Sequence, residues 1–211
     1  MIAVALAACG GGSSSGSNER AGTYAVAVTQ AEFPAKQHLG QTSLMRIGVR
    51  NTGKKTIPAL TVSVTVRGEE GEASSLPFAI RDPQPGLAQP DRPVWVLAAH
   101  YPKRAGDSAA GGAATSSAKT FNFGPLKANK SVVGIWKLSA VKAGDYKLLY
   151  RIDAGVGGTA KAKTAAGKAP GGSFAVKVLT SPPNTIVTDS GEVVEVPAEK
   201  KRSQDQKQPK R

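Results

Sequence analysis

Residues 44–67, LMRIGVRNTGKKTIPALTVSVTVR, hold two runs of alternating apolar and polar side chains, joined by a turn. In the first run Met45, Ile47 and Val49 share one face, while Arg46 and Arg50 share the other. The second run alternates three valines with Thr and Ser, at Val62, Val64 and Val66. A period of two is typical of half-buried strands. The stretch therefore predicts an antiparallel sheet with one face in the core and one in water.

The same alternation continues on both sides of this stretch. It covers residues 23–30, 131–140, 145–153 and 173–180, and less regular strands are expected at 94–101 and 120–126. The inward residues should be Tyr24, Val26, Val28, Val132, Trp136, Leu138, Tyr146, Leu148, Tyr150, Ile152, Phe174, Val176 and Val178. No stretch shows a long helical period. Seven or so strands separated by turns indicate an all-β sandwich.

Two segments carry a resemblance to a known family. VRNTGKKTIPALTVSV, residues 49–64, resembles the CARDB and DUF11 type of bacterial immunoglobulin-like domain. KAGDYKLLYRID is similar to the tyrosine-corner segment of such sandwiches, with Tyr146 two residues before Leu148, where antibody domains carry Cys. The resemblance covers residues 21–180 and implies a single antiparallel immunoglobulin-like β-sandwich. Members of this family are mostly adhesive, structural or spacer-like, and they share no catalytic set.

Three segments depart from a minimal domain of this type. Residues 67–93 are expected to form a long, proline-punctuated loop, and residues 103–119 a mobile loop of small residues. These two insertions leave the strand order open. Residues 181–211 should be a C-terminal extension, with either a small hairpin over 189–191 or an extended tail, and a disordered basic tail from about residue 198.

The N-terminal residues Leu6-Ala7-Ala8-Cys9, followed by GGGSSSGSNE, resemble a bacterial lipobox. On this reading residues 1–8 are the remnant of a signal peptide whose natural start lies upstream. Cys9, the single cysteine, is then lipidated, and residues 9–20 form a tether. The protein would be extracytoplasmic and anchored to the cell membrane by lipid. The alternative is a short disordered N-terminus with an accidental Cys. No run of about 20 apolar residues exists, which argues against a spanning helix.

The chain is strongly basic, with 28 Lys and Arg against 15 Asp and Glu, a formal charge of +13. Such an excess attracts anionic surfaces such as lipid head groups or acidic wall polymers. Nucleic acid is not expected, because the basic residues lack the interleaved aromatic residues on which bases stack. The alternative is that the charge forms a solvated surface and serves only solubility.

Two motifs resemble nucleotide-binding loops, and two histidines are possible metal ligands, but the residues around them do not fit these functions. Residues 48–55 nearly spell a phosphate-binding loop, but Lys55 stands where Ser or Thr is needed. Residues 155–160 fit G-x-G-x-x-A, yet no helix is expected after them, so we interpret them as a glycine-rich hairpin region. His38 and His100 have no neighbour at metal-ligand spacing. We expect no catalytic residues, no metal and no cofactor.

These observations favour an envelope-anchored lipoprotein that is not an enzyme and acts as a binding, structural or spacer module. Its partners would be the membrane, through the lipid anchor, and an anionic cell-wall polymer or another envelope protein. An alternative is a module that binds carbohydrate or wall polymer, with candidate contacts at Trp95, Tyr101, Lys103, Arg104 and Lys119. A third hypothesis is an enzyme, which would need a cleft lined by residues such as His100, Asp82 and Asp91.

Overall fold

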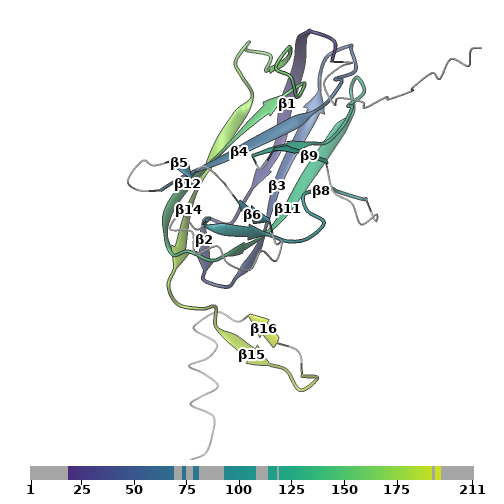
Figure 1. The fold of residues 1–211 in the computed structure, drawn as a ribbon. Coiled ribbons are helices and arrows are strands. Elements are labelled where there is room, and N and C mark those ends of the chain that lie inside the picture. Colours follow the sequence, from purple (N-terminus) through teal and green to yellow (C-terminus); the bar gives the residue numbers. More distant parts are fainter. Residues whose placement is uncertain are drawn as a thin grey trace, which may run out of the picture.

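A computed structural model describes residues 19–68, 73–74, 78–80, 93–107, 114–117, 119–191 and 193–195. These residues form strands and connections, with no helix among them, and two seven-stranded sheets pack against each other (Figure 1). A separate two-stranded hairpin lies below the body in that view. The described part of the chain is therefore an all-β protein with two packed sheets, and none of its segments is a helix long and apolar enough to span a membrane.

The first sheet has the strand order β13-β1-β3-β11-β7-β6, and β8 pairs with β11 beside this path. Its long central strands are β1 (Gly22–Glu32), β3 (Thr42–Asn51) and β11 (Ser131–Ala140). The shorter strands are β6 (Phe78–Ile80), β7 (Trp95–Leu97), β8 (Lys103–Arg104) and β13 (Ala160–Lys163). Most neighbours are antiparallel, but β13 runs parallel to β1, and β6 runs parallel to β7.

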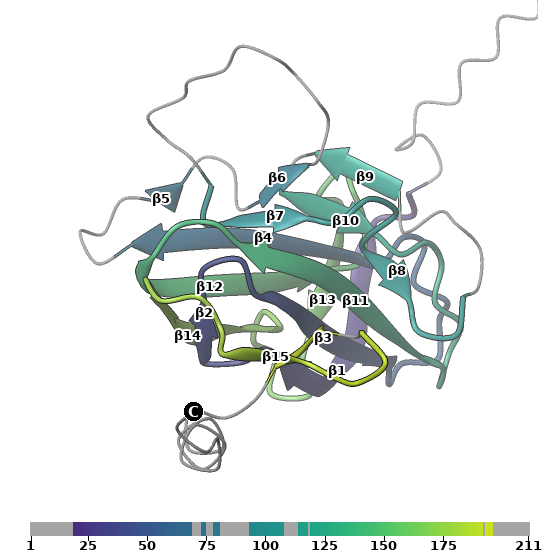
Figure 2. The ribbon, with the colours of Figure 1, turned by 90° about the horizontal axis from the view of Figure 1, so that it is seen from below.

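The second sheet has the order β2-β14-β12-β4-β10-β9, with β5 beside β4. Its long strands are β4 (Thr61–Gly68), β12 (Gly144–Asp153) and β14 (Gly171–Leu179). The shorter ones are β2 (Lys36–His38), β5 (Ala73–Ser74), β9 (Ala114–Ser117) and β10 (Thr120–Asn122). Seen from below, β5, β6 and β9 lie along one margin of the body (Figure 2).

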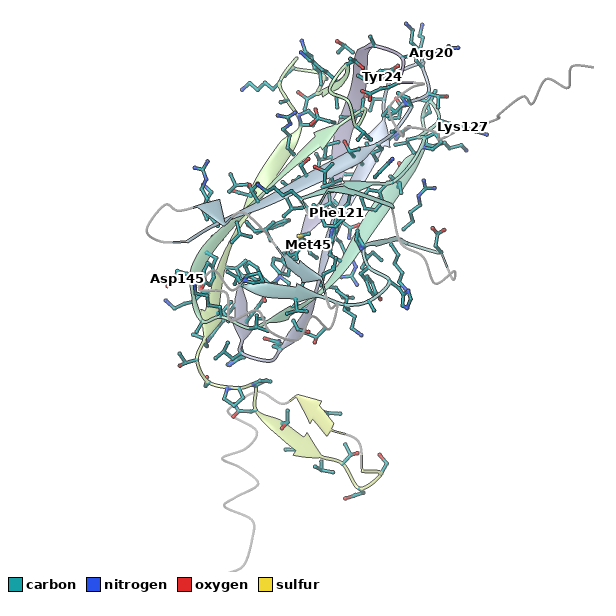
Figure 3. All side chains as sticks on the ribbon, viewed as in Figure 1. Arg20, Tyr24, Met45, Phe121, Lys127 and Asp145 are labelled. Carbon is teal, nitrogen blue, oxygen red and sulfur yellow. The ribbon has the colours of Figure 1, made fainter. Side chains whose placement is uncertain are left out.

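The core lies between the sheets, where Met45 and Phe121 are seen in the middle of the body (Figure 3). It contains two groups of aromatic rings in contact. Trp136 packs against Phe121 and Phe123, with ring centroids 5.8 and 5.4 Å apart. In the second group Trp95 packs edge-on against Phe33 and Tyr146. Phe33 also contacts Phe174, which stacks on Tyr150. These large rings supply much of the apolar area that stabilises the fold.

The inward faces predicted from alternation are confirmed. Met45, Ile47 and Val49 are at most 1% exposed. The other inward residues are buried or, in a few cases, partly buried against the same core: Tyr24, Val26, Val28, Val62, Val64, Val66, Val132, Trp136, Leu138, Tyr146, Leu148, Tyr150, Ile152, Phe174, Val176 and Val178. The alternation therefore indicated correctly which side chains enter the space between the sheets.

Two local features match the segments that carried the family resemblance. The Tyr146 hydroxyl donates to the Ala143 carbonyl at 2.8 Å, which is the contact expected of a tyrosine corner. In the turn after β3, buried Asn51 donates through Nδ2 to the carbonyls of Lys55 and Leu126, and its Oδ1 accepts the Gly53 N–H. Residues 48–55 therefore form the end of a strand and a turn, as expected.

The two predicted loops are partly wrong. Residues 67–93 include the end of β4 together with β5 and β6, and Phe78 in β6 is buried against Phe121. Residues 103–119 include β8 and β9. A β-ladder is built from backbone hydrogen bonds, so short segments of small or charged residues can pair at a sheet margin without an apolar pattern.

The ends of the body also differ from expectation. Glu19 and Arg20, which we expected to belong to the tether, contact the sandwich. The region after Gly155 is not a simple hairpin, because β13 crosses to the first sheet and pairs with β1. After β14, β15 (Thr185–Val187) and β16 (Val193–Glu195) form the hairpin that the sequence left open. The signal remnant, Cys9 and the tail from residue 198 lie outside the described residues.

Candidate binding surfaces

The candidate ligand contacts do not form one site. Trp95 is 0% exposed, and its Nε1 donates to Gln37 Oε1 at 2.8 Å, so it is a core residue and cannot stack against a sugar. Tyr101 and Lys103 do lie together, with Lys103 Nζ 4.9 Å from the Tyr101 ring centroid. Lys119 is exposed in the turn before β10, a strand of the other sheet. Strand alternation alone could not distinguish a Trp on the surface from one in the core.

Arg104 lines a hollow of about 380 Å³ between β8, the segment 123–126 and the start of β11. The polar side chains of the hollow are Arg104, Asp107 and Ser131, and Phe123 and Val133 supply part of its apolar wall. Phe123 reaches over Gly134, where a Cβ would collide with its ring. The hollow has the size of a small-molecule site. Because a carboxylate lies among its polar groups, it offers no clear preference for an anion.

Of the residues proposed for an enzymatic cleft, His100 is the one that the structure describes. His100 is exposed in a turn after β7, with a φ of 63°. Asp82 and Asp91 lie outside the described residues. Within the described ranges, no three His, Cys, Asp or Glu side chains form a group that could hold a metal ion.

The outer face of the first sheet carries cations on several of its strands. Directly opposite residues in a ladder share a face. Arg46 lies opposite Ile135, and Ile135 lies opposite Lys103. Arg50 lies opposite Ala27 of β1, and on that same face Lys161 and Lys163 of β13 lie beside Thr23 and Ala25. We define the basic face as Arg46, Arg50, Lys103, Lys137, Lys161 and Lys163. It crosses five strands, a width of about 19 Å at the usual strand spacing.

Few acids balance the basic face. Within the described part of this face the acid is Glu32, whose Oε2 lies 4.0 Å from Arg46 Nη1. No ion pair is described for Arg50, Lys137, Lys161 or Lys163. Half-buried Leu44, Val133 and Ile135 lie between the cations. This surface can contact a polyanion over several charges while keeping some apolar area in reach.

The outer face of the second sheet has a different charge pattern. It carries the cations Lys36, Arg67, Lys147, Arg151 and Lys177, of which two are paired with acids. Arg151 contacts Asp153 at 2.7 Å, and Lys177 contacts Asp145 at 3.0 Å. The uncompensated charge is therefore greater on the first sheet.

A third feature lies at the end of the body where β1 begins. Glu19 Oε2 accepts the N–H groups of Val156 and Gly157 at 3.1 and 2.6 Å, and Oε1 accepts the N–H of Ala160 at 2.9 Å. Desolvation raises the pKa of the Glu19 carboxyl. The hydrogen bonds from these N–H groups and from the Thr159 side chain lower the pKa, and their combined effect is the larger one. The net result is a pKa below the ordinary value, so the carboxylate is held in its charged form.

The sequence marked the loop 155–160 by its glycines but gave no sign of its partner. Glu19 and Val156 are 137 residues apart, and no periodicity links them. The basic face was likewise missed as a surface, because its cations are spread over four strands of one sheet, β3, β8, β11 and β13. Only the strand order, which the sequence left open, places them together.

The geometry defines the class of protein as an all-β sandwich with a basic sheet face. The sequence matches no protein family and no curated protein. Solved structures with some similarity include the CARDB domain of the PF1109 protein from Pyrococcus furiosus in complex with di-metal ions. That similarity has 12% identity and a TM-score of 0.41, over 74% of this chain and 93% of that one.

A second similar structure is native alpha-2-macroglobulin from Escherichia coli, spanning domain MG7 to the C-terminus. It has 13% identity and a TM-score of 0.41, over 80% of this chain and 21% of that one. A third is β-glucosidase from Listeria innocua in complex with glucose, with 10% identity and a TM-score of 0.37, over 75% and 16%. At these levels the similarities assign no function to this chain.

Proposed function

We propose that the chain is a non-catalytic binding module, anchored outside the cell membrane through lipid on Cys9, whose basic face binds an anionic polymer of the envelope. The observation that supports this proposal best is the basic face, with six cations and one described acid across five strands. A tethered body with such a surface needs no catalytic group. It holds its position by contacts with a charged surface near the membrane.

The physics of the basic face agrees with binding to a repeating polyanion. Arg46 and Lys137 stand on adjacent strands, and Arg46 and Lys103 stand two strands apart, about 10 Å at the usual strand spacing. These separations are close to the screening length of about 8 Å at physiological ionic strength, so neighbouring cations act together on one ligand. The half-buried Leu44, Val133 and Ile135 offer apolar contact beside them. A repeating polymer of phosphates or carboxylates fits this pattern better than a single small anion.

Sugar binding through an aromatic platform has less support, because Trp95 is in the core. The other aromatic candidate contact, Tyr101, is partly buried against the core, and the Lys103 ammonium group lies over its ring. A spacer role without any ligand is the competing hypothesis, in which the charge serves solubility alone.

The test compares matched variants of the full chain. Variant one carries Arg50→Gln, Lys161→Gln and Lys163→Gln on the basic face, and variant two carries Lys36→Gln, Arg67→Gln and Lys147→Gln on the second sheet. Both lose three positive charges. Binding to an acidic wall polymer at low salt should fall at least tenfold in variant one and change less than threefold in variant two. Equal losses in the two variants would mean that binding depends on net charge and not on the basic face. Absence of binding by the parent would contradict the proposal.

The anchor is tested separately. Expressed behind a complete signal peptide, the parent should partition into detergent, and Cys9→Ser should remain in the aqueous phase, because the thiol that takes the lipid is gone. If Cys9→Ser still enters the detergent phase as the parent does, the lipid anchor is wrong. Polymer binding by the basic face is measured on the delipidated chain, so the two parts of the proposal can fail independently.

A further inference from the structure

The loop 155–160 binds a carboxylate through its backbone, and the binding geometry is complete. Three N–H groups, from Val156, Gly157 and Ala160, converge on the two oxygens of Glu19. Successive backbone N–H groups that converge in this way form a nest, which is a general binding site for anions. We call residues 155–160 the nest. Glu19 is its occupant in this structure.

Two glycines, Gly155 and Gly158, give the nest the space and the backbone conformation that an oxyanion needs. The carboxylate of Glu19 lies where a side chain on Gly155 would stand, since a Cβ there would overlap both oxygens. Gly158 has a φ of +79°, a left-handed conformation that turns the chain so that N–H groups on both sides of it face inward. The G-x-G-x-x-A pattern therefore has a physical use here, although β13 follows it instead of a helix.

Contacts other than Glu19 hold the nest in shape. The hydroxyl of buried Thr61 donates to the Gly155 carbonyl at 3.1 Å, and Ala59 N–H donates to the Ala154 carbonyl at 3.2 Å. At the other end, Ala160 is the first residue of β13, in the ladder with Gly22. The donors are thus fixed by the sandwich, and the site should persist when the carboxylate leaves.

The Glu19 side chain, by contrast, is held mainly by its hydrogen bonds to the nest. It precedes β1 and belongs to no strand. The backbone beside it is retained by other contacts, since Gly22 N–H donates to the Thr159 carbonyl and the Tyr24 hydroxyl donates to the Arg20 carbonyl. Arg20 and Tyr24 lie together at the upper end of the body (Figure 3). The Glu19 side chain can therefore swing out while β1 stays in place.

We propose that the nest is an exchangeable oxyanion site, which Glu19 closes and which takes a free carboxylate or phosphate group when Glu19 leaves. Exposed Lys161 follows the nest on β13 and adds positive charge near its mouth. The same carboxylate or phosphate chemistry can come from a small solute or from an acidic polymer. Binding at the nest would release the Glu19 side chain from the body, while the Arg20 carbonyl and β1 keep their own contacts. The inference does not rest on the basic face or on the lipid anchor.

The test uses the full chain with Glu19→Ala, and Glu32→Ala as a matched control that removes one acid at the far end of β1, away from the nest. Backbone amide signals of Val156, Gly157 and Ala160 are followed by NMR while sodium acetate or inorganic phosphate is added. In Glu19→Ala these three signals should shift together and saturate. In the parent and in Glu32→Ala the apparent affinity should be at least tenfold weaker, because Glu19 competes.

The arms of the experiment separate the possible outcomes. Saturation by phosphate at concentrations where acetate has no effect would define a phosphate site, and the reverse a carboxylate site. Adding Gly155→Ala to Glu19→Ala should abolish the response, since the Cβ fills the space of the anion. If Glu19→Ala does not fold, Glu19→Gln, which keeps an acceptor oxygen, is titrated in the same way. A folded variant whose nest amides show no saturable shift with either salt would overturn the proposal.

Discussion

Two short strands, β2 and β13, each run parallel to a long strand at the margin of a sheet, but they are attached to the body in different ways. β2 runs parallel to β14, and β13 runs parallel to β1. β2 is fixed from inside by Gln37, which is 0% exposed and joins Trp95 to the Pro34 carbonyl. The loop into β13 is fixed from the surface by the carboxylate of Glu19. A neutral amide in the core makes a permanent attachment, whereas a charged group at the surface makes one that acid or a competing anion can release.

The largest effect should come from the buried amide. Gln37→Ala removes the acceptor of the Trp95 indole N–H and leaves a cavity beside it. Because an unsatisfied buried donor and a cavity each cost stability, the free energy of unfolding should fall by about 3 kcal/mol. Urea denaturation measures this loss. Lys36→Ala, at the exposed neighbour in β2, is the control and should change stability little; a loss below about 1 kcal/mol for Gln37→Ala would mean that the amide does not anchor β2.

The same bond can be broken from its other end. Trp95→Phe keeps an aromatic ring in the core but removes the indole N–H, leaving Gln37 Oε1 without this donor. We expect a loss of about 2 kcal/mol in the free energy of unfolding. In a double-mutant cycle with Gln37→Ala the two losses should not add, since both remove one interaction. Additive losses would show that the bond itself contributes nothing.

A smaller effect is expected at the surface attachment. Glu19→Ala removes three charge-assisted hydrogen bonds from a partly exposed carboxylate, and solvent competes for the freed N–H groups. The free energy of unfolding should fall by about 1 kcal/mol. Thermal unfolding compared with Glu32→Ala measures the difference. A loss as large as that of Gln37→Ala would abolish the contrast between the two strands.

The smallest and most specific effect is the dependence on pH. The pKa of Glu19 is lower in the folded protein than the ordinary value of 4.5, so its stabilising contribution is complete above that value. The contribution is lost as the pH falls through the folded pKa. The stability difference between the parent and Glu19→Ala should therefore be constant near neutral pH and shrink in acid. A difference that stays constant down to pH 3, measured by urea denaturation, would contradict the assignment.

The core of the fold could be predicted from the sequence because strand alternation is a local signal. Ile47, Val64 and Ile152 each stand between residues of the opposite face, so the sequence around them predicts that they are buried, as they are. β13 has the same signal in four residues, AKAK, where Ala160 and Ala162 are buried and the lysines are exposed. It was missed because small apolar residues after a glycine-rich loop are more typical of a turn.

The candidate surfaces could be predicted much less well, because they depend on strand order. The sequence contains each lysine of the basic face, but only the pairing of β13 with β1 places Lys161 and Lys163 beside β3. Trp95 was a candidate contact until its strand was placed, and its partner Gln37 lies 58 residues away. Long-range pairs of this kind have no local pattern from which to infer them.

The pairing of β1 with β13 also affects the order in which the strands can pair during synthesis. A chain that emerges N-terminus first, from a ribosome or a channel, presents β1 well before residues 160–163 appear. Until then β1 has an open edge of unpaired backbone groups, which invites association with other chains. Such distant contacts also slow folding. The first strand to emerge is among the last to gain its full set of neighbours, so β1 is exposed to association with other chains for longer than a strand that pairs only with its neighbours in sequence.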